Sequence, residues 1–301
     1  MKNAVGPVLR MSDDIDAIIA AIEEDNPDTE IEVIDRGAYV RIQAEQRMKV
    51  TRASIERHIG RTFEMRQLEP MTPQWLRVLS IVFTPMRYPA HVLQMMQAYL
   101  GQIAPSSYIT NCTAFAAADQ LRLVSLVAYR TRQLQMAQPD AGFATGERQI
   151  WETHPDWQPT RRALETALVA YDWGECLTAV NLVLYPTLSE ILLRQLGIVA
   201  DTNHDQLTWL LLSNLSIDAE RHSRWSAALA RYAISKRPGN ASVLRRWVQR
   251  WTPKADEAAA GLAHLLAEIP EAGRDAETTM TAAKAARERV LSDAGVLAAI
   301  D

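Results

Sequence analysis

The first seventy residues alternate between short apolar runs and charged turns, a pattern that predicts a small α+β module. Isoleucines recur at the spacing of one helical face, at Ile15, Ile18, Ile19 and Ile22. Ser12 and Asp13 can cap this helix, and Asn26-Pro27 stops it because the residue before proline disfavours the helical conformation. A second helix is predicted from Thr51 to Ile59, with Gly60 as its terminator.

Between these two helices the pattern predicts a β-hairpin. Residues 31–34 form its first strand, Asp35-Arg36-Gly37 its turn, and residues 38–43 its second strand, in which apolar and polar side chains alternate. An extended segment around residues 63–68 follows the second helix, and the closely spaced Pro70 and Pro73 mark a boundary. We therefore expect one domain over residues 1–71 and a second over residues 72–301.

After Pro73 the apolar positions follow long helical periods. The predicted helices are Trp75–Phe83, Ala90–Ile103, Thr113–Met136, Thr160–Tyr171, Gly174–Tyr185 and Gln206–Ile234. The predicted breaks fall at Pro85, Pro105, residues 139–142, Pro155, Pro186 and Pro238-Gly239. Long helices with short connections favour a bundle. The tail over residues 271–301 is rich in Ala, Arg and Glu and fits either a solvated helix or a partly disordered segment.

Composition narrows the classes of function. Of 301 residues, 48% are hydrophobic and 23% are charged, which is typical of a folded protein, and only 12 glycines favour helices. Subtracting 36 acidic from 32 basic residues gives a net charge of -4 without a basic block, so nucleic acid is not an expected partner. Two cysteines cannot form a disulfide framework and suit a reducing cytosol. Without a signal-peptide pattern or eighteen uninterrupted apolar residues, we expect a cytoplasmic chain outside the membrane.

A helix bundle of this size can hold two iron ions, but only with a particular set of ligands. The set is one Glu from each of two helices and a Glu-x-x-His pair from each of two others, because positions i and i+3 share one inward face. Of the six histidines, only His204 stands three residues after a carboxylate, that of Asp201. In this polar break, capping of the next helix is the simpler role. A complete di-iron site is therefore not expected.

Two polar clusters look like ligand motifs but have the wrong spacing or residue types. Glu220 and His222 are two residues apart and project about 200 degrees from each other around a helix, so they cannot share one metal ion. The run over residues 218–224 is better explained by ion pairs among its own side chains. Asp119 and Arg122 stand at i and i+3, where an ion pair is expected. The chain has no Gly-x-Ser-x-Gly elbow and no phosphate-binding glycine loop.

Four short stretches in the first module carry a resemblance to a known family. They are Val5-Gly6-Pro7, Asp25-Asn26-Pro27, Glu32 to Arg36 and Ala38 to Ile42. Over residues 5–69 the chain resembles the effector, or coupling, protein of toluene and related aromatic monooxygenases. The resemblance implies a module without a cofactor that docks on the hydroxylase and couples electron delivery and O2 activation to substrate oxidation. It makes Asn26, Asp35, Arg36 and Tyr39 candidates for the docking surface, with turn and hairpin stability as the competing role.

A longer series of motifs carries a second resemblance, over residues 77–266. The motifs are Pro105-Ser106-Ser107 with Asn111-Cys112, Tyr129-Arg130-Thr131, Pro139 to Gly142, Asp172 to Glu175 and Ala219 to Ser226. They are similar to the β subunit of the hydroxylase from the same enzyme systems. The resemblance implies a ferritin-like, ribonucleotide-reductase-like bundle that lacks the di-iron ligands and packs against a catalytic α subunit. Asp119, Arg122, Ala219 and His222 then look like vacated ligand positions.

The two resemblances together imply partners and cofactors outside this chain. The expected partners are the hydroxylase α and γ subunits, a Rieske ferredoxin and a reductase. Di-iron is expected in the α subunit, and a Rieske 2Fe-2S cluster, FAD and NADH in the other components. The chain itself is expected to have no cofactor and no active site, and to support a monooxygenase that hydroxylates aromatic or alkene hydrocarbons.

Three interpretations of the whole chain remain open. The first is a non-catalytic fusion in which the end of the effector and the beginning of the β subunit are missing at the junction. The second is an autonomous ferritin-like metal-binding oxidoreductase, which needs carboxylates such as Glu175, Glu190 and Glu220 to converge with His222. The third is an inactive fusion remnant that folds without a partner.

Overall fold

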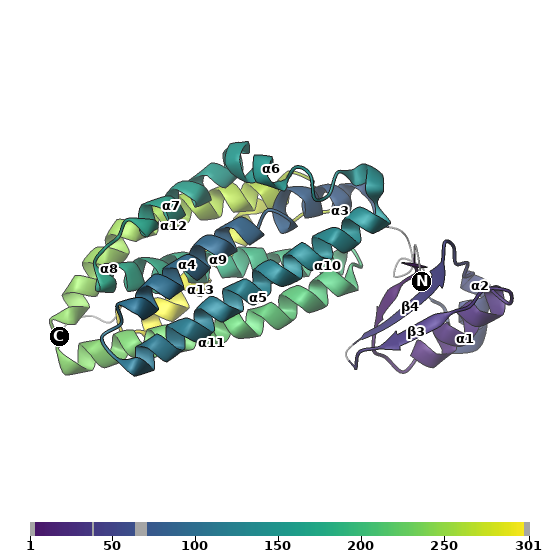
Figure 1. The fold of residues 1–301 in the computed structure, drawn as a ribbon, viewed down its shortest axis with the longest axis horizontal. Coiled ribbons are helices and arrows are strands. Elements are labelled where there is room, and N and C mark those ends of the chain that lie inside the picture. The colour runs from purple at the N-terminus through teal and green to yellow at the C-terminus, as the bar shows by residue number, and fades with distance from the viewer. Residues whose placement is uncertain (1–3, 38, 64–70, 298–301) are drawn as a thin grey trace.

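The computed structural model describes residues 4–37, 39–63 and 71–297, and Figure 1 shows how they are arranged. A small α+β module over residues 4–63 lies at one end of a long bundle of helices. The mainly helical fold that the sequence predicts is confirmed.

The module contains a small sheet built around one central strand. Its strands are β1 (Ala4–Val5), β2 (Val8–Arg10), β3 (Glu32–Asp35) and β4 (Tyr39–Glu45). Strand β4 pairs antiparallel with β3, with Glu32 opposite Gln43, which confirms the predicted hairpin. Along its other side β4 pairs antiparallel with β1 and then with β2. The chain passes from β1 to β2 through Gly6, where a Cβ atom would lie 2.0 Å from the carbonyl oxygen of Ile42, so only glycine fits.

Two helices, α1 (Ile15–Asp25) and α2 (Arg52–Ile59), complete the module. The predicted start of α1 is wrong in one detail, since the helix follows Asp14 rather than Ser12 or Asp13. The side chain of Asp14 does not cap the helix and instead pairs with Arg61. Helix α2 has the predicted ends, because the Thr51 hydroxyl accepts a hydrogen bond from a first-turn N–H and the αL residue Gly60 stops the helix.

The module has a hydrophobic core of its own. The two helices, the sheet and the segment after α2 contribute the buried side chains Leu9, Ile15, Ile18, Ala21, Ile22, Val40, Ile42, Ile55 and Phe63. The predicted extended segment over residues 63–68 falls within the described part only at Phe63, and residues 64–68 lie outside the described residues.

The bundle contains eleven α-helical segments among the described residues. They are α3 (Pro73–Val78), α4 (Arg87–Gln102), α5 (Ser107–Ala137), α6 (Glu147–Thr153), α7 (Gln158–Leu168), α8 (Trp173–Leu177), α9 (Tyr185–Ser189), α10 (Leu196–Thr202), α11 (Gln206–Lys236), α12 (Asn240–Ala267) and α13 (Ala276–Asp293). Short 3-10 turns stand at Pro139–Ala141 and Pro155–Trp157, and π-helical turns at Leu79–Phe83, Thr178–Leu184 and Glu190–Gln195. Helices α5 and α11 lie side by side, and α7 lies beside α12 (Figure 1).

Helices α8, α9 and α10 and the two π-helical turns between them form one continuous helix, Trp173–Thr202, which we call the central helix. The break predicted at Pro186 is therefore wrong. The N–H of Tyr185 bonds the carbonyl of Val180, five residues back, so Pro186 falls where the π-helical register ends and its missing N–H is tolerated. By length and apolar composition this helix is able to cross a membrane, but 94% of its most apolar window is buried inside the protein.

Helices α12 and α13 complete the bundle. Helix α12 has no counterpart among the predicted helices, and it contains Pro253 in its interior. It packs closely on the turn before α7, because Gly261 lets the two backbones approach and a Cβ there would lie 2.2 Å from the Asp156 carbonyl oxygen. Of the two structures predicted for the tail, a solvated helix or a partly disordered segment, the helix is present from Ala276 to Asp293. It is not wholly solvated, because it packs against α12 through buried side chains.

Candidate functional site

Polar side chains from four long helices meet at the centre of the bundle. They are Gln97 from α4, Gln120 from α5, Asn181 and Tyr185 from the central helix, and His222 from α11, and all five are buried. The Gln97 amide donates a hydrogen bond of 2.7 Å to Asn181 Oδ1, and the Gln120 amide donates one of 3.2 Å to the Tyr185 hydroxyl. The His222 ring stacks on the Tyr185 ring with 4.0 Å between their centroids. We call these five residues the polar centre.

The polar centre is uncharged. Burial and, to a smaller extent, the neighbouring Arg221 charge together lower the pKa of His222 to about 3. Burial also raises the pKa of the Tyr185 hydroxyl above its usual range, although the hydrogen bond from Gln120 opposes this shift. At neutral pH the imidazole and the phenol are therefore both neutral.

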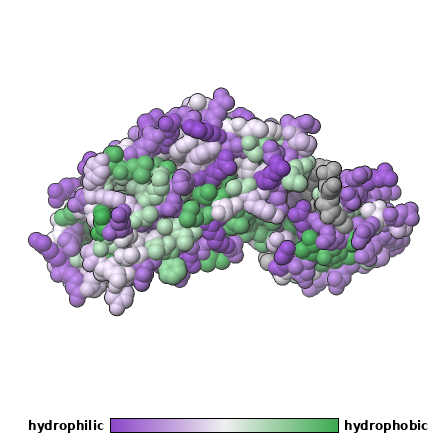
Figure 2. Space-filling model, viewed as in Figure 1, coloured by the Kyte–Doolittle hydropathy of each residue, from purple (hydrophilic) through white to green (hydrophobic). Residues whose placement is uncertain are grey.

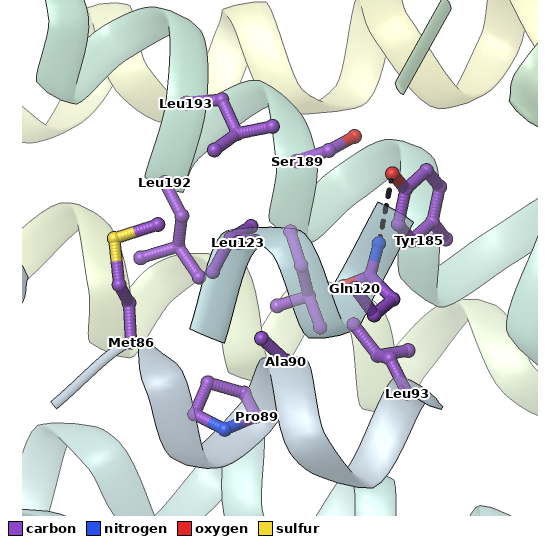
Figure 3. A pocket seen from close by; sticks show the side chains of 11 residues that line it. Met86, Pro89, Ala90, Leu93, Gln120, Leu123, Tyr185, Ser189, Leu192 and Leu193 are labelled. Carbon is purple, nitrogen blue, oxygen red and sulfur yellow. Dashed lines mark hydrogen bonds between the residues drawn. The ribbon is translucent and has the colours of Figure 1, made fainter. Parts of the chain in front are cut away.

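A small cavity borders the polar centre (Figure 3). It measures about 20 Å³, and Gln120 and Tyr185 stand at one end of a lining that is otherwise mostly apolar. Such a volume holds one water molecule and no larger ligand. Nearby polar atoms are incompletely paired, because Gln97 Oε1, Asn181 Nδ2 and both ring nitrogens of His222 have no hydrogen-bond partner among the described residues. Amide, phenol and imidazole groups without a carboxylate do not fit a di-iron centre.

Two of the four predicted ligand-like positions are buried in the bundle, and the other two lie at the contact between α5 and α11. Ala219 and His222 are buried on the inner face of α11, whereas Asp119 and Arg122 form ion pairs between α5 and α11, with Asp119 mostly covered and Arg122 more exposed. The ion pair expected between Asp119 and Arg122 is wrong. Asp119 instead binds Arg221 with both carboxylate oxygens at 2.7 Å, and Arg122 pairs with Asp218.

Asp119 and Arg122 pair with residues of α11 rather than with each other because α5 packs antiparallel against α11. This packing brings each side chain close to an opposite charge on the facing helix, and Asp218 also accepts a hydrogen bond of 3.0 Å from Arg221. Four charged side chains thus form one cross-helix network, Asp119, Arg122, Asp218 and Arg221. Of the ion pairs expected within the run 218–224, only that between Asp218 and Arg221 is present among the described residues.

The carboxylates required for an autonomous metal site do not converge. Glu175 pairs with Arg250, Glu190 with Arg194, and Glu220 with Arg194 as well. Within residues 4–37, 39–63 and 71–297, no three side chains of His, Cys, Asp or Glu are grouped so that they could hold a metal ion. At the polar break before α11, Asp205 rather than Asp201 caps the helix.

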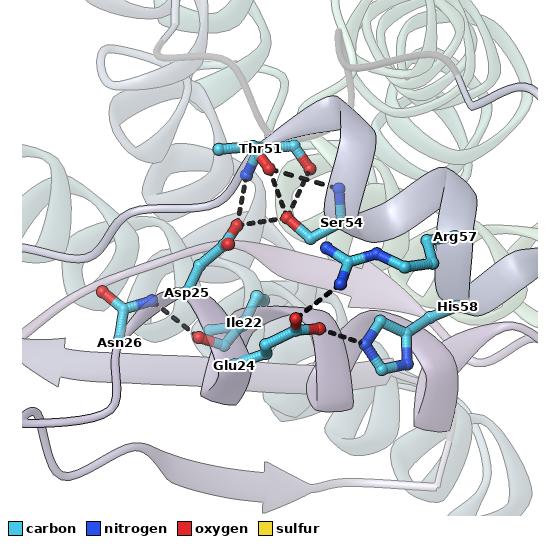
Figure 4. Close-up of polar contacts among 8 residues, drawn as sticks. All are labelled: Ile22, Glu24, Asp25, Asn26, Thr51, Ser54, Arg57 and His58. Carbon is cyan, nitrogen blue, oxygen red and sulfur yellow. Dashed lines mark hydrogen bonds and ion pairs between the residues drawn. The ribbon is translucent and has the colours of Figure 1, made fainter.

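The candidate docking residues of the module have different surroundings, and Figure 4 shows those of Asn26. Both polar atoms of the Asn26 side chain are used inside the module: its amide nitrogen donates to the carbonyl oxygens of Ile22 and Lys49, and its amide oxygen accepts from the Lys49 N–H. These bonds hold the end of α1 against the segment that leads to α2. The structure thus supports the competing role in turn stability for Asn26, and its docking role stays a prediction.

The hairpin residues are more accessible. Asp35 and Arg36 are exposed at the turn, and Tyr39 is half-buried at the start of β4. The Asp35 carboxylate accepts a hydrogen bond of 2.6 Å from the Gly37 N–H, and the Arg36 N–H bonds the Tyr39 carbonyl. These hydrogen bonds join residues on the two sides of the turn and leave the Arg36 side chain exposed, as a docking surface needs, but docking itself stays a prediction.

The sequence patterns did not predict the polar centre. Its signal is present in retrospect, because Gln97 follows two methionines in α4 and Asn181 stands within an apolar run of the central helix. A polar residue on the apolar face of a helix predicts a buried hydrogen-bonding partner. The identity of that partner depends on which helices face each other, which the sequence does not specify.

The fold and this centre define a class: a helix-bundle protein in which neutral amide, phenol and imidazole groups occupy the centre. The Methane/Phenol/Alkene Hydroxylase family model matches residues 35–237, so the chain belongs to that family. It is 41% identical over 198 residues to the β subunit of the hydroxylase component of the toluene-4-monooxygenase system of Ectopseudomonas mendocina. That match covers 65% of this chain and 60% of the relative, so the chain spans less than two thirds of the subunit that it resembles.

Two further comparisons extend this result. A solved structure of toluene 4-monooxygenase with toluene bound in its resting active site matches with a TM-score of 0.63 and 40% identity, over 65% of this chain and 64% of that chain. The expected ferritin-like hydroxylase-subunit fold is thereby confirmed. The chain is also 48% identical over 68 residues to the effector subunit of the alkene monooxygenase system of Xanthobacter autotrophicus, a match that covers 23% of this chain and 67% of that subunit.

Proposed function

We propose that the chain is a non-catalytic component of a cytoplasmic multicomponent monooxygenase that hydroxylates aromatic or alkene hydrocarbons. The observation that carries this proposal is the 41% identity to a hydroxylase β subunit, together with a bundle centre made of neutral groups. In this role the bundle supports a separate catalytic α subunit, which holds the di-iron centre. A γ subunit, a Rieske ferredoxin with its 2Fe-2S cluster, and a reductase that uses FAD and NADH complete the system.

We further propose that residues 1–71 form an effector-like domain fused to a β-subunit-like domain over residues 72–301. The likeness of 68 residues to an effector subunit and the separate hydrophobic core of the module support this division. Asn26, Asp35, Arg36 and Tyr39 remain its proposed docking surface. The exposure of Asp35 and Arg36 supports this assignment, because a docking surface must be accessible to its partner.

The full chain, co-expressed with an affinity-tagged hydroxylase α subunit and a γ subunit from the same organism, tests this function. We expect the chain to be retained on the tagged α subunit, and iron to be found in the complex at about the level of the α subunit alone. The purified chain by itself is expected to bind no stoichiometric iron. Two irons per isolated chain would instead support the autonomous metal enzyme.

The same preparation separates a working fusion from a remnant. With ferredoxin, reductase and NADH supplied but no separate effector, the complex is expected to form hydroxylated product in proportion to the NADH consumed. Failure of the α subunit to retain the chain would support the inactive remnant. Retention with NADH consumption but little product would support the β-subunit role and contradict the effector role.

A further inference from the structure

The outer face of α5 carries a row of large, exposed side chains. Tyr108 is 83% exposed, Phe115 and Tyr129 are each 67% exposed, and Met136 is 64% exposed. Single exposed apolar residues are ordinary on a protein surface, but several large ones on one face of a single helix indicate an interaction site. Figure 2 shows this face of the bundle, on which hydrophobic side chains lie among hydrophilic ones.

The spacing of the row is that of a helix-packing seam. Tyr108, Phe115, Tyr129 and Met136 are separated by seven, fourteen and seven residues, and Arg122 occupies the remaining heptad position. A second row, offset by three residues, contains the exposed Asn111, Ala118, Ser125 and Arg132. Ala118 and Ser125 are small, so a partner helix can approach α5 closely there. The seam spans about 42 Å at 1.5 Å per residue, which a partner helix of similar length would match.

Charge determines which kind of helix fits. In the cross-helix network, the carboxylate side chains of Asp119 and Asp218 are only 15% and 14% exposed, whereas Arg122 and Arg221 are 43% and 48% exposed. The arginine side chains are therefore more exposed than the carboxylates to which they are bound, and Arg122 is the charged side chain that the seam presents at its middle. Arg122 also stands midway along the seam, with two of the large side chains on each side of it.

This arrangement disfavours pairing with a second copy of the chain. A two-fold axis through the middle of the seam would place Arg122 of one chain against Arg122 of the other, and like charges at an interface oppose association. The nine named positions of the two rows include Arg122 and Arg132 but no Asp or Glu. A different polypeptide that presents an apolar helical face with an acidic residue near its middle avoids the repulsion and complements this positive charge.

From this geometry we propose that the heptad seam of α5 is the surface on which the chain binds a long, apolar and acidic helix of the catalytic hydroxylase subunit. The inference rests on the proposed function and adds the surface and the chemistry of the partner. Phe115 and Tyr129 are the large apolar side chains of the seam that stand nearest to Arg122. They therefore lie near the centre of the proposed interface, where most of the binding free energy is usually concentrated.

The test uses the co-expressed complex of full-length chain and tagged catalytic subunit. In the variants Phe115→Asp and Tyr129→Asp, a negative charge replaces an apolar contact and faces the proposed acidic partner. Each side chain is mostly exposed, so folding is expected to be retained and is checked by circular dichroism. Tyr171→Asp is the matched control, because Tyr171 is 77% exposed but lies in the connection between α7 and α8.

We expect each seam variant to reduce the amount of chain retained by the catalytic subunit at least about tenfold, and the control to change it little. A photo-crosslinker at Ser125 is expected to join the chain to a helical, acidic segment of the catalytic subunit, and one at Tyr171 to join nothing. Retention of the seam variants at the wild-type level would overturn the inference while the proposed function stands. Loss of retention for the wild-type chain would overturn both. A wild-type dimer that Phe115→Asp converts to a monomer would show that a second copy covers the seam.

Discussion

At the scale of single residues, His222 is a titratable group that burial keeps neutral. Its pKa is about 3 in the folded chain, against about 6.5 for an unperturbed histidine. Between these two values the unfolded chain binds a proton at this position and the folded chain does not. The free energy of unfolding therefore rises with pH in this window. Above about pH 6.5 the ring is neutral in both states and has no effect on it, and for each pH unit below that value the free energy of unfolding falls by up to about 1.4 kcal/mol.

We predict that His222→Phe reduces this loss of stability on acidification. Phenylalanine keeps an aromatic ring against Tyr185 but cannot bind a proton. Urea unfolding at about pH 7 and about pH 5 measures the free energy of unfolding of both proteins, and the decrease between the two values is expected to be smaller for the variant. An equal decrease in the two proteins would show that His222 is not held neutral by burial.

His264→Gln is the control for this experiment. The exposed His264 ring is hydrogen-bonded to the Asp156 carboxylate at 2.7 Å, which raises the pKa of the imidazole. A raised pKa stabilises the folded chain at low pH, and this stabilisation is lost as pH rises through the folded-state value. In His264→Gln, the decrease in the free energy of unfolding between about pH 7 and about pH 5 is therefore expected to be unchanged or larger than in the wild type. This is the opposite of the result expected for His222→Phe.

At the scale of secondary-structure elements, Asp205 joins three helices. Its carboxylate caps α11 by accepting from the N–H and the hydroxyl of Thr208, accepts from the Trp75 indole of α3 at 3.2 Å, and pairs with Arg130 of α5 at 2.9 Å. Arg130 is itself buried. Loss of the Asp205 charge would leave a buried guanidinium without its counter-charge, which costs more than the loss of an exposed ion pair.

We predict that Asp205→Asn lowers the free energy of unfolding of the bundle by about 3–5 kcal/mol, because it leaves this buried cation unpaired. Urea unfolding followed by tryptophan fluorescence measures the change. Asp201→Asn is the matched control, since the exposed Asp201 accepts one hydrogen bond from Gln206 and its loss is expected to change stability by less than about 0.5 kcal/mol. Equal effects of the two variants would contradict the role given to Asp205.

Local sequence signals predicted the elements whose ends depend on neighbouring residues. Thr51 and Gly60 mark the ends of α2, and the turn at residues 35–37 marks the hairpin, because caps and turns act over a few residues. The continuity of the central helix through Pro186 was not predictable in this way, since it depends on a π-helical register that tertiary packing stabilises. The cross-helix pairing of Asp119 with Arg221 likewise depends on how α5 and α11 face each other.

At the scale of the whole molecule, the chain has two separate hydrophobic cores. One lies between the sheet and the helices α1 and α2, and the other fills the bundle. All eight tryptophans are in the bundle part of the sequence, between Trp75 and Trp251. Tryptophan fluorescence therefore reports on unfolding of the bundle, whereas circular dichroism reports on both parts. This difference provides a direct test of the proposed division into two domains.

Ile42 is fully buried in the smaller core, and we predict that Ile42→Ala destabilises the module alone. Shortening a buried isoleucine to alanine costs about 2–5 kcal/mol, which is a large part of the stability of a module this small. The urea midpoint from tryptophan fluorescence is expected to stay at the wild-type value, while hydrogen exchange of the amides in β4 becomes faster. Val33→Ala, at an exposed position of the same sheet, should change neither measurement. A shift of the fluorescence midpoint in Ile42→Ala would mean that the two cores unfold as one cooperative unit and that the boundary near residue 71 is not a domain boundary.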